Sequence, residues 1–466
     1  MKADGFSGKR AFSLVEHLAV GIGPRLTGSA GEHRAARFIE RYFRDLGLST
    51  RTQRYPCITF GVERCRFEVR DRGRWRAVPC QPVMLSRNTP PSGVAGPLHF
   101  ADAGGEENLS PAMEGRIVLV CGRFDFELFP RLLACKPLAL VFIEQELTEE
   151  PIRVNFMDHN RTLFGNLPAC RIRHLDGLEL VKRGVKEGRF VLRTRERRSH
   201  SLNVIGELPG GEVPEEIVLV TSHYDSSMGI PGASDNAGGT ALMMELARVF
   251  ARAGSRRTLR FVAFSGEETG LHGSLHYARD LAARAERERK RKGFDKRAHK
   301  TELDRHRLCL NLDVHGAVLG RNECWYSGED AVGISVRLLS KETGTVVQVK
   351  KAPMSSDGTC LAALGIPTLQ LARYGGTTRF LHSTRDGLEH LSPAALEQAG
   401  AFAELYLRRY AAGAAAFPFE RTVPEDQMKR IKRFFEKGMK TAPPGEKEDG
   451  KKGGAARKGK AGAGRG

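Results

Sequence analysis

The 466-residue chain has no long hydrophobic run, and apolar stretches such as Leu138 to Ile143 are far too short to cross a bilayer. Its start carries basic residues but no continuous apolar core, so we expect no signal peptide and a cytoplasmic location. The chain also lacks a CxxC motif, and its nine cysteines are an odd number. Without a secretion signal, this pattern favours free thiols over a disulfide framework.

The net charge of +19 is concentrated in two local segments. Residues 284–307 hold eleven Lys and Arg against five Asp and Glu, and residues 437–466 hold nine against three. Two short basic segments are typical of a solvated helix and a disordered tail, and they do not make a wide binding face. Nucleic acid is therefore not the expected partner.

With 40% hydrophobic and 28% charged residues, the chain has the composition of a globular protein long enough for two or more domains. Residues 9–47 follow a helical period around a Gly-rich turn at 23–33. Residues 52–199 change character to short β-type runs, such as GRIVLVCG and LALVFIEQ, between turns. We interpret residues 52–199 as an inserted, mainly β domain.

After residue 200, strand and helix patterns alternate. Four segments each predict a strand that precedes or follows a helical pattern: IVLVTSH, TLRFVAFSG, LCLNLDV and PTLQLAR. Such alternation predicts an α/β fold with a mostly parallel central sheet sandwiched between helices.

Four of these predicted strands end in side chains that bind metals. The residues are His223 and Asp225, Glu267 and Glu268, Asp313, and, in the loop after the last strand, His382. In open α/β sheets, ligands bind beyond the carboxyl ends of the strands, so these groups should meet at one edge. A further acidic residue, Asp235, lies in the Gly-rich loop that follows the first of them.

Imidazole and carboxylate ligands suit Zn²⁺. Two His and three carboxylates are too few for two separate four-coordinate sites unless one carboxylate bridges. Two metals about 3.5–4 Å apart can polarise a carbonyl and activate water near neutral pH. Because neighbours on an extended chain point in opposite directions, one glutamate of the Glu267–Glu268 pair could bind metal while the other acts as general base.

Five motifs resemble, in order, those of the di-zinc aminopeptidase family that includes aminopeptidase Y and plasma glutamate carboxypeptidase. They are SHYDS, GASDNAGGTA, FSGEETGLHGS, NLDV and FLHSTRD. The opening GPRLTGSAGEHRAARFIERYFRDLGL is similar to the start of that family, so the resemblance spans residues 23–48 and 203–410. One departure is the segment SSDGT, where Gly358 and Thr359 replace the usual His and Pro.

The resemblance implies a role for each candidate. Asp235 would bridge two zinc ions, His223 and Asp313 would hold one, and Glu268 and His382 the other. Glu267 would be the general base, and Asp225 would orient His223. It also implies a cis peptide bond between Asp235 and Asn236.

The middle segment is similar to a protease-associated domain, which some members carry near the active-site entrance. The expected organisation is a zinc peptidase catalytic domain at 1–51 and 200–436, an inserted protease-associated-like domain at 52–199, and a disordered basic tail at 437–466.

The sequence therefore predicts a di-zinc exopeptidase, and in particular an aminopeptidase with peptide substrates and two Zn²⁺ per chain. A carboxypeptidase or dipeptidase, a glutaminyl cyclase on the same scaffold, and a non-catalytic binding protein remain alternatives. The side-chain preference, the biological substrate and the oligomeric state do not follow from the sequence.

Overall fold

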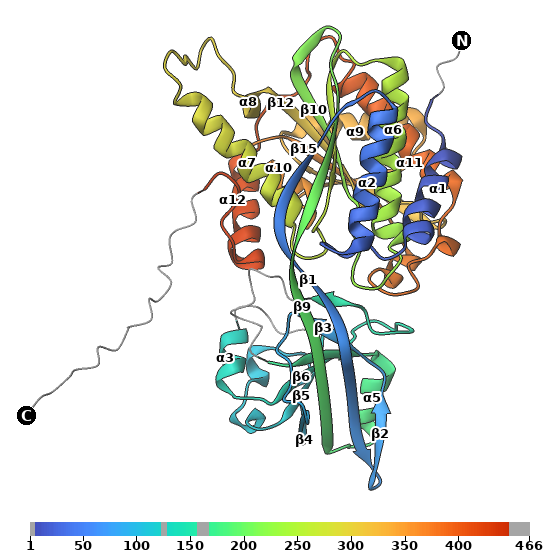
Figure 1. The fold of residues 1–466 in the computed structure, drawn as a ribbon, viewed down its shortest axis with the longest axis vertical. Coiled ribbons are helices and arrows are strands. Elements are labelled where there is room, and N and C mark those ends of the chain that lie inside the picture. The colour runs from blue at the N-terminus through green and yellow to red at the C-terminus, as the bar shows by residue number, and fades with distance from the viewer. Residues whose placement is uncertain (1–4, 123–127, 156–166, 447–466) are drawn as a thin grey trace, which may run out of the picture.

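The computed structural model describes residues 5–122, 128–155 and 167–446, which form two lobes joined by two very long strands (Figure 1). These are β1 (Ser49–Asp71) and β9 (Glu187–Leu208). They pair antiparallel from Ser49↔Glu207 to Arg70↔Glu187, with one irregularity between Val62 and Arg64. The predicted domain boundaries at 51/52 and 199/200 thus fall inside continuous strands.

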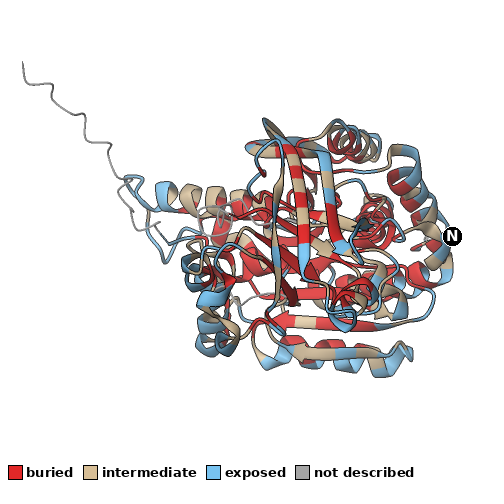
Figure 2. Ribbon diagram, turned by 90° about the horizontal axis from the view of Figure 1, so that it is seen from below, coloured by how far each residue is buried: buried red, intermediate tan, exposed pale blue. Residues whose placement is uncertain are grey.

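The larger lobe contains a mixed, mostly parallel sheet in the order β14-β13-β15-β12-β10-β11-β9. Its further strands are β10 (Val213–His223), β11 (Arg257–Phe264), β12 (His306–Leu312), β13 (Gly320–Ser327), β14 (Val347–Lys351) and β15 (Thr368–Gly375). β10, β11, β12 and β15 are neighbours that run parallel to one another. β11 is buried along its whole length, as expected for a strand covered on both faces. Buried segments gather in the middle of the molecule (Figure 2).

Helices cover both faces of this sheet, which confirms the predicted α/β sandwich. One face is packed by α1 (Gly8–Glu16), α2 (Ala30–Asp45), α6 (Gly239–Ala253), α9 (Asp330–Thr343) and α11 (Pro393–Tyr406). The other is packed by α7 (His272–Arg289), α10 (Gly358–Ala362) and α12 (Glu425–Arg433). A short helix, α8 (Glu302–Arg305), precedes β12.

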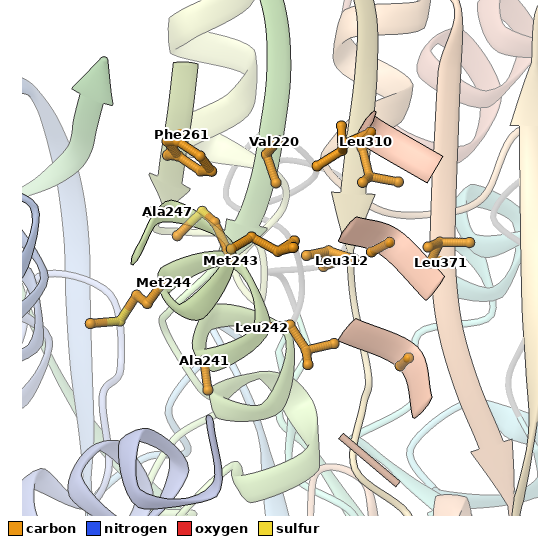
Figure 3. Packing of buried hydrophobic residues seen from close by; sticks show 14 of the residues in the cluster. Val220, Ala241, Leu242, Met243, Met244, Ala247, Phe261, Leu310, Leu312 and Leu371 are labelled. Atoms are coloured by element: carbon orange, nitrogen blue, oxygen red, sulfur yellow. The ribbon is translucent and has the colours of Figure 1, made fainter. Parts of the chain in front are cut away.

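Helix α6, which follows the loop that carries Asp235, is almost entirely buried. Every residue from Gly239 to Phe250 is buried, and Met243 and Leu242 pack against Leu310 and Leu312 of the sheet (Figure 3). Burying a leucine or methionine side chain stabilises the fold by about 1.5–3 kcal/mol. This packing fixes the loop that precedes α6 against the ends of the central strands.

The smaller lobe, here called the inserted lobe, lies between β1 and β9 in the sequence and extends the sheet in the order β9-β4-β5-β6-β8-β3-β7. Its elements are β2 (Arg74–Val78), β3 (Cys80–Met84), β4 (Val94–Phe100), β5 (Ile117–Cys121), α3 (Phe129–Ala134), β6 (Ala139–Ile143), β7 (Val154–Asn155), β8 (Ala169–Ile172) and α5 (His174–Lys182). Two hydrophobic clusters fill the two faces of this part of the sheet, so the lobe has its own core. All nine cysteines of the chain are free thiols.

Packed structure continues further toward the C-terminus than predicted. Helix α12 and the helical turn Phe434–Met439 follow the last expected helix, and Ile431, Phe435 and Met439 are buried against the face formed by α7 and α10. These apolar residues recur every four positions, which is a helical spacing, but the basic and glycine-rich composition of the tail was given more weight. The predicted tail at 437–466 therefore begins with packed residues, and its part from 447 on lies outside the described residues. No helix in the described ranges is long and apolar enough to span a membrane.

A buried histidine makes the stability of this fold depend on pH. The side chain of His306, at the start of β12, places Nδ1 2.8 Å from the carbonyl oxygen of Glu302 and Nε2 3.4 Å from Nη1 of Arg260. Burial, together with the charge of Arg260, lowers the pKa of His306 to about 3. Below the unfolded-state pKa of about 6.5, the unfolded chain binds a proton that the folded chain does not. The stability is therefore present above about pH 6.5 and is lost as the pH falls toward 3.

We expect His306→Gln to remove this contribution. The free energy of unfolding, measured with urea between pH 7 and pH 5, should fall less steeply in the variant, by up to roughly 1.4 kcal/mol per pH unit. Equal slopes for the wild type and the variant would contradict this origin of the pH dependence.

Candidate metal centre

The seven candidate residues of the sequence lie together at the carboxyl edge of the central sheet. His223 is the last residue of β10, Asp313 follows β12, Glu267 and Glu268 follow β11, and His382 follows β15 after a short helical turn. Asp225 lies two residues beyond β10, and Asp235 lies in the turn Ala233–Gly238 before α6. Because β15, β12, β10 and β11 are adjacent and parallel, their ends deliver these side chains to one place.

The first ligand group consists of His223, Asp235 and Asp313, all of them buried. His223 Nε2 lies 3.2 Å from Asp235 Oδ1 and 3.2 Å from Asp313 Oδ1. One ligand atom from each residue falls within 4.8 Å of the others, so a single cation can contact all three.

The second ligand group consists of Asp235, Glu268 and His382. His382 Nε2 lies 3.3 Å from Asp235 Oδ2 and 3.1 Å from Glu268 Oε2. Asp235 thus offers one carboxylate oxygen to each group. The His223 side chain is 1% exposed and that of His382 is 34% exposed, so the second group is the more open one.

These residues fit a divalent metal. Burial opposes a charge on His223, yet Asp313, Asp225 and Asp235 outweigh it and raise its pKa well above the usual value. The carboxylates of Glu268 and Asp235 likewise outweigh burial and raise the pKa of His382 well above its usual value. A buried oxygen of Glu268, Oε1, has no hydrogen-bond partner among the described residues, and a bound cation would compensate its negative charge. Nitrogen and oxygen donors of this kind suit zinc.

The Glu267–Glu268 pair does not lie on an extended chain, so that part of the sequence argument was wrong. Both residues form a bend and turn after β11, where Gly270 N donates to Glu267 O at 2.9 Å. Burial raises the pKa of the Glu267 carboxyl well above its usual value, and the carboxylates of Asp313 and Asp357 act in the same direction against the opposing charge of His223.

Asp225 is fully buried behind His223, with its Oδ1 3.5 Å from His223 Nδ1. Thr27 Oγ1 donates to Asp225 Oδ2 at 3.0 Å, and the backbone N–H of Glu267 donates to Oδ1 at 3.3 Å. Asp225 therefore connects His223 to the turn that carries Glu267. The peptide bond between Asp235 and Asn236 is cis.

Sequence reasoning missed two residues that hold the ligand loops. Arg25 is fully buried, and its guanidinium donates to the carbonyl oxygens of Tyr224, Pro231 and Gly232 at 2.8, 2.6 and 2.9 Å. The carboxylate of Asp386 accepts from the backbone N–H groups of Ser234 and Asp235 at 2.8 and 3.0 Å. The turn at 23–33 is thus a support of the site and more than a connection between helices.

Two other residues near the last ligand make contacts of their own. Arg373 donates to the carbonyl oxygens of Ala317 and Val318 and to Asn322, so it is a structural residue. Phe380 stacks on His390 with ring centroids 4.8 Å apart.

Residues 203–406 match the family model described as peptidase family M28. The chain is 27% identical to aminopeptidase YwaD of Bacillus subtilis over 427 residues, which are 85% of this chain and 83% of that protein. The structure of BSAP, a zinc aminopeptidase from Bacillus subtilis, matches with a TM-score of 0.69 at 26% identity, over 91% of this chain and 99% of that chain. A peptidase M28 precursor from Shewanella amazonensis has the same fold, with a TM-score of 0.73 at 19% identity over 90% of this chain and 96% of that chain.

The fold, the two ligand groups and these relatives together define a zinc-dependent metallopeptidase. Within this class, residues 203–406 are a peptidase domain of family M28.

Proposed function

We propose that the protein is a di-zinc aminopeptidase that removes N-terminal residues from peptides. The observation that carries the proposal is the position of Asp235, whose two oxygens face two different ligand groups. His223 and Asp313 would hold one zinc, and Glu268 and His382 the other. When bound, two zinc ions would polarise the scissile carbonyl and increase the acidity of water.

Glu267 is the proposed general base. It would accept a proton from the attacking water and pass that proton to the leaving amine. Burial raises the pKa of Glu267, and a more basic carboxylate accepts a proton more readily. Asp225 would keep the imidazole of His223 in the orientation that directs Nε2 at the metal position.

The relatives support an aminopeptidase over a carboxypeptidase, because two of them are named aminopeptidases. Besides the metal ligands, the carboxyl groups of Glu267, Asp357 and Asp386 lie around the site. Carboxyl groups of this kind can accept hydrogen bonds from the amino group of a substrate.

A panel of substrates tests this proposal. We expect release of fluorophore from aminoacyl substrates with a free amino group and at least a hundredfold slower release from their N-acetyl forms. A zinc chelator should abolish the activity, and added zinc should restore it. Release only from blocked substrates, or cyclisation of N-terminal glutamine without hydrolysis, would contradict the proposed function.

A further inference from the structure

One segment of the inserted lobe reaches the metal centre of the larger lobe. This segment, residues 149–153, is here called the latch; it ends at the start of the short strand β7. A cleft of about 540 Å³ lies beside it, lined by Arg153 and Met228 together with residues of β1 and β3. The two lobes are thus separated by open space next to the latch, so the contacts of the latch connect them at this point.

Arg153 makes the central contacts of the latch. Its backbone N–H donates to the carbonyl oxygen of His382 at 2.7 Å. Its Nη1 donates to the carbonyl oxygens of Met228 and Gly229 at 3.0 and 2.8 Å. Gly229 has φ +70°, and a Cβ at this position would lie 2.6 Å from Arg153 Nη1, so the glycine permits the close approach of the guanidinium.

One of the two loops that Arg153 joins carries His382, and the other contacts Glu268, which is the other ligand specific to the second group. His382 itself provides one ligand atom. Ser227, next to Met228, donates its hydroxyl to Glu268 Oε2 at 2.6 Å. The first group is held from within the larger lobe, by Asp225 behind His223 and by Ser356, whose hydroxyl donates to Asp313 Oδ2 at 2.5 Å.

The latch is firmly attached to the inserted lobe at its base. The backbone N–H of Ile152 donates to Glu144 Oε1 at 3.0 Å. Glu144 is buried and accepts two hydrogen bonds from the guanidinium of Arg171 on β8, at 2.7 and 2.5 Å. At the other end of the latch, Glu150 accepts from the hydroxyl of Thr384 at 2.6 Å. A connected set of polar contacts therefore runs from the core of the inserted lobe to the loop that carries His382.

The geometry of His382 explains why such support matters. Its backbone has φ +60°, a conformation that is strained for a residue with a side chain and that persists only where surrounding contacts hold it. Its side chain is also much more exposed than that of His223. The ligand loop of His382 thus depends on contacts that hold it in this conformation.

We propose that Arg153 is a positioning residue for the second zinc position, so that occupancy of this position, and not of the first, depends on the docking of the inserted lobe. This inference rests on the proposed two-zinc function. Residues that hold metal ligands in place typically change metal affinity by about 10–100-fold when they are replaced.

The test is a titration of metal-free protein with zinc, in which calorimetry measures the heat of binding. It compares the wild type, Arg153→Ala and a matched control. The control is Arg131→Ala, which removes an exposed arginine of the same lobe that pairs with Glu106. Arg153→Ala removes the guanidinium contacts to Met228 and Gly229 and keeps the backbone contact to His382. We expect this variant to bind the second zinc about 10–100-fold more weakly, with the first unchanged and with activity restored by excess zinc. Arg131→Ala should match the wild type. Arg153→Lys, the milder variant, should weaken the same site to a smaller extent.

Wild-type affinity for both zinc ions in Arg153→Ala would overturn the proposal, and so would an equal loss at both positions. If Arg153→Ala does not fold, Arg153→Lys decides in the same way. A wild-type protein that binds fewer than two zinc ions would instead contradict the two-zinc function itself, so the two failures can be distinguished.

Discussion

Glu267→Gln should lower kcat by about 10²–10⁴-fold, the contribution expected of a general base, while zinc content stays as in the wild type. Glutamine has nearly the same shape but accepts no proton at neutral pH. Because Glu267 is not a member of either ligand group, its loss should leave metal binding intact. Steady-state kinetics on an aminoacyl substrate and elemental analysis of the same protein sample measure both quantities.

The matched control for this variant is Glu420→Gln, which neutralises an exposed carboxylate in the segment that follows α11. It should have wild-type kcat and KM. Full activity in Glu267→Gln would show that another group accepts the proton, and loss of zinc from this variant would show that Glu267 is itself a ligand.

Asp235→Ala should cause the largest loss of metal, because this residue supplies an oxygen to both ligand groups. After dialysis against metal-free buffer, the variant should retain much less than one zinc per chain and have no measurable activity. His382→Ala removes a ligand from the second group alone, so it should retain close to one zinc. The contrast between the two variants, measured by elemental analysis, tests the bridging role.

Other zinc contents in these two variants would contradict the proposed roles. Two zinc ions in Asp235→Ala would show that the residue does not bridge. Loss of both zinc ions from His382→Ala would show that the two positions are not independent. Unfolding curves of both variants are needed to establish that the losses occur in folded protein.

The grouping of most candidate ligands could be predicted because they stand near the ends of strand patterns that are easy to identify. IVLVTSH, LRFVAFSG and LCLNLD are short apolar runs whose ends are polar, and parallel neighbours bring such ends together. The identity of the bridging residue came from family resemblance, since nothing in the local pattern of Asp235 distinguishes a ligand from a turn residue. The same holds for Asp225, for which the structure gives a distance of 3.5 Å between Oδ1 and His223 Nδ1.

The supporting contacts could not be predicted because they join residues far apart in the sequence. Arg25 contacts the loop around Tyr224 and Gly232, and Arg153 contacts Met228 and His382. A single arginine in a turn or a loop has no periodicity that would reveal its partners. The length of β9 was missed for a related reason: its exposed, Arg-rich central part lacks the apolar alternation of a half-buried strand.

The most direct test of the central claim is anomalous X-ray diffraction at the zinc absorption edge from crystals of the protein grown with zinc. The account predicts two anomalous peaks about 3.5–4 Å apart, with the carboxylate of Asp235 between them, one peak beside His223 and Asp313 and the other beside Glu268 and His382. A single peak, or a pair that does not share Asp235, would contradict it.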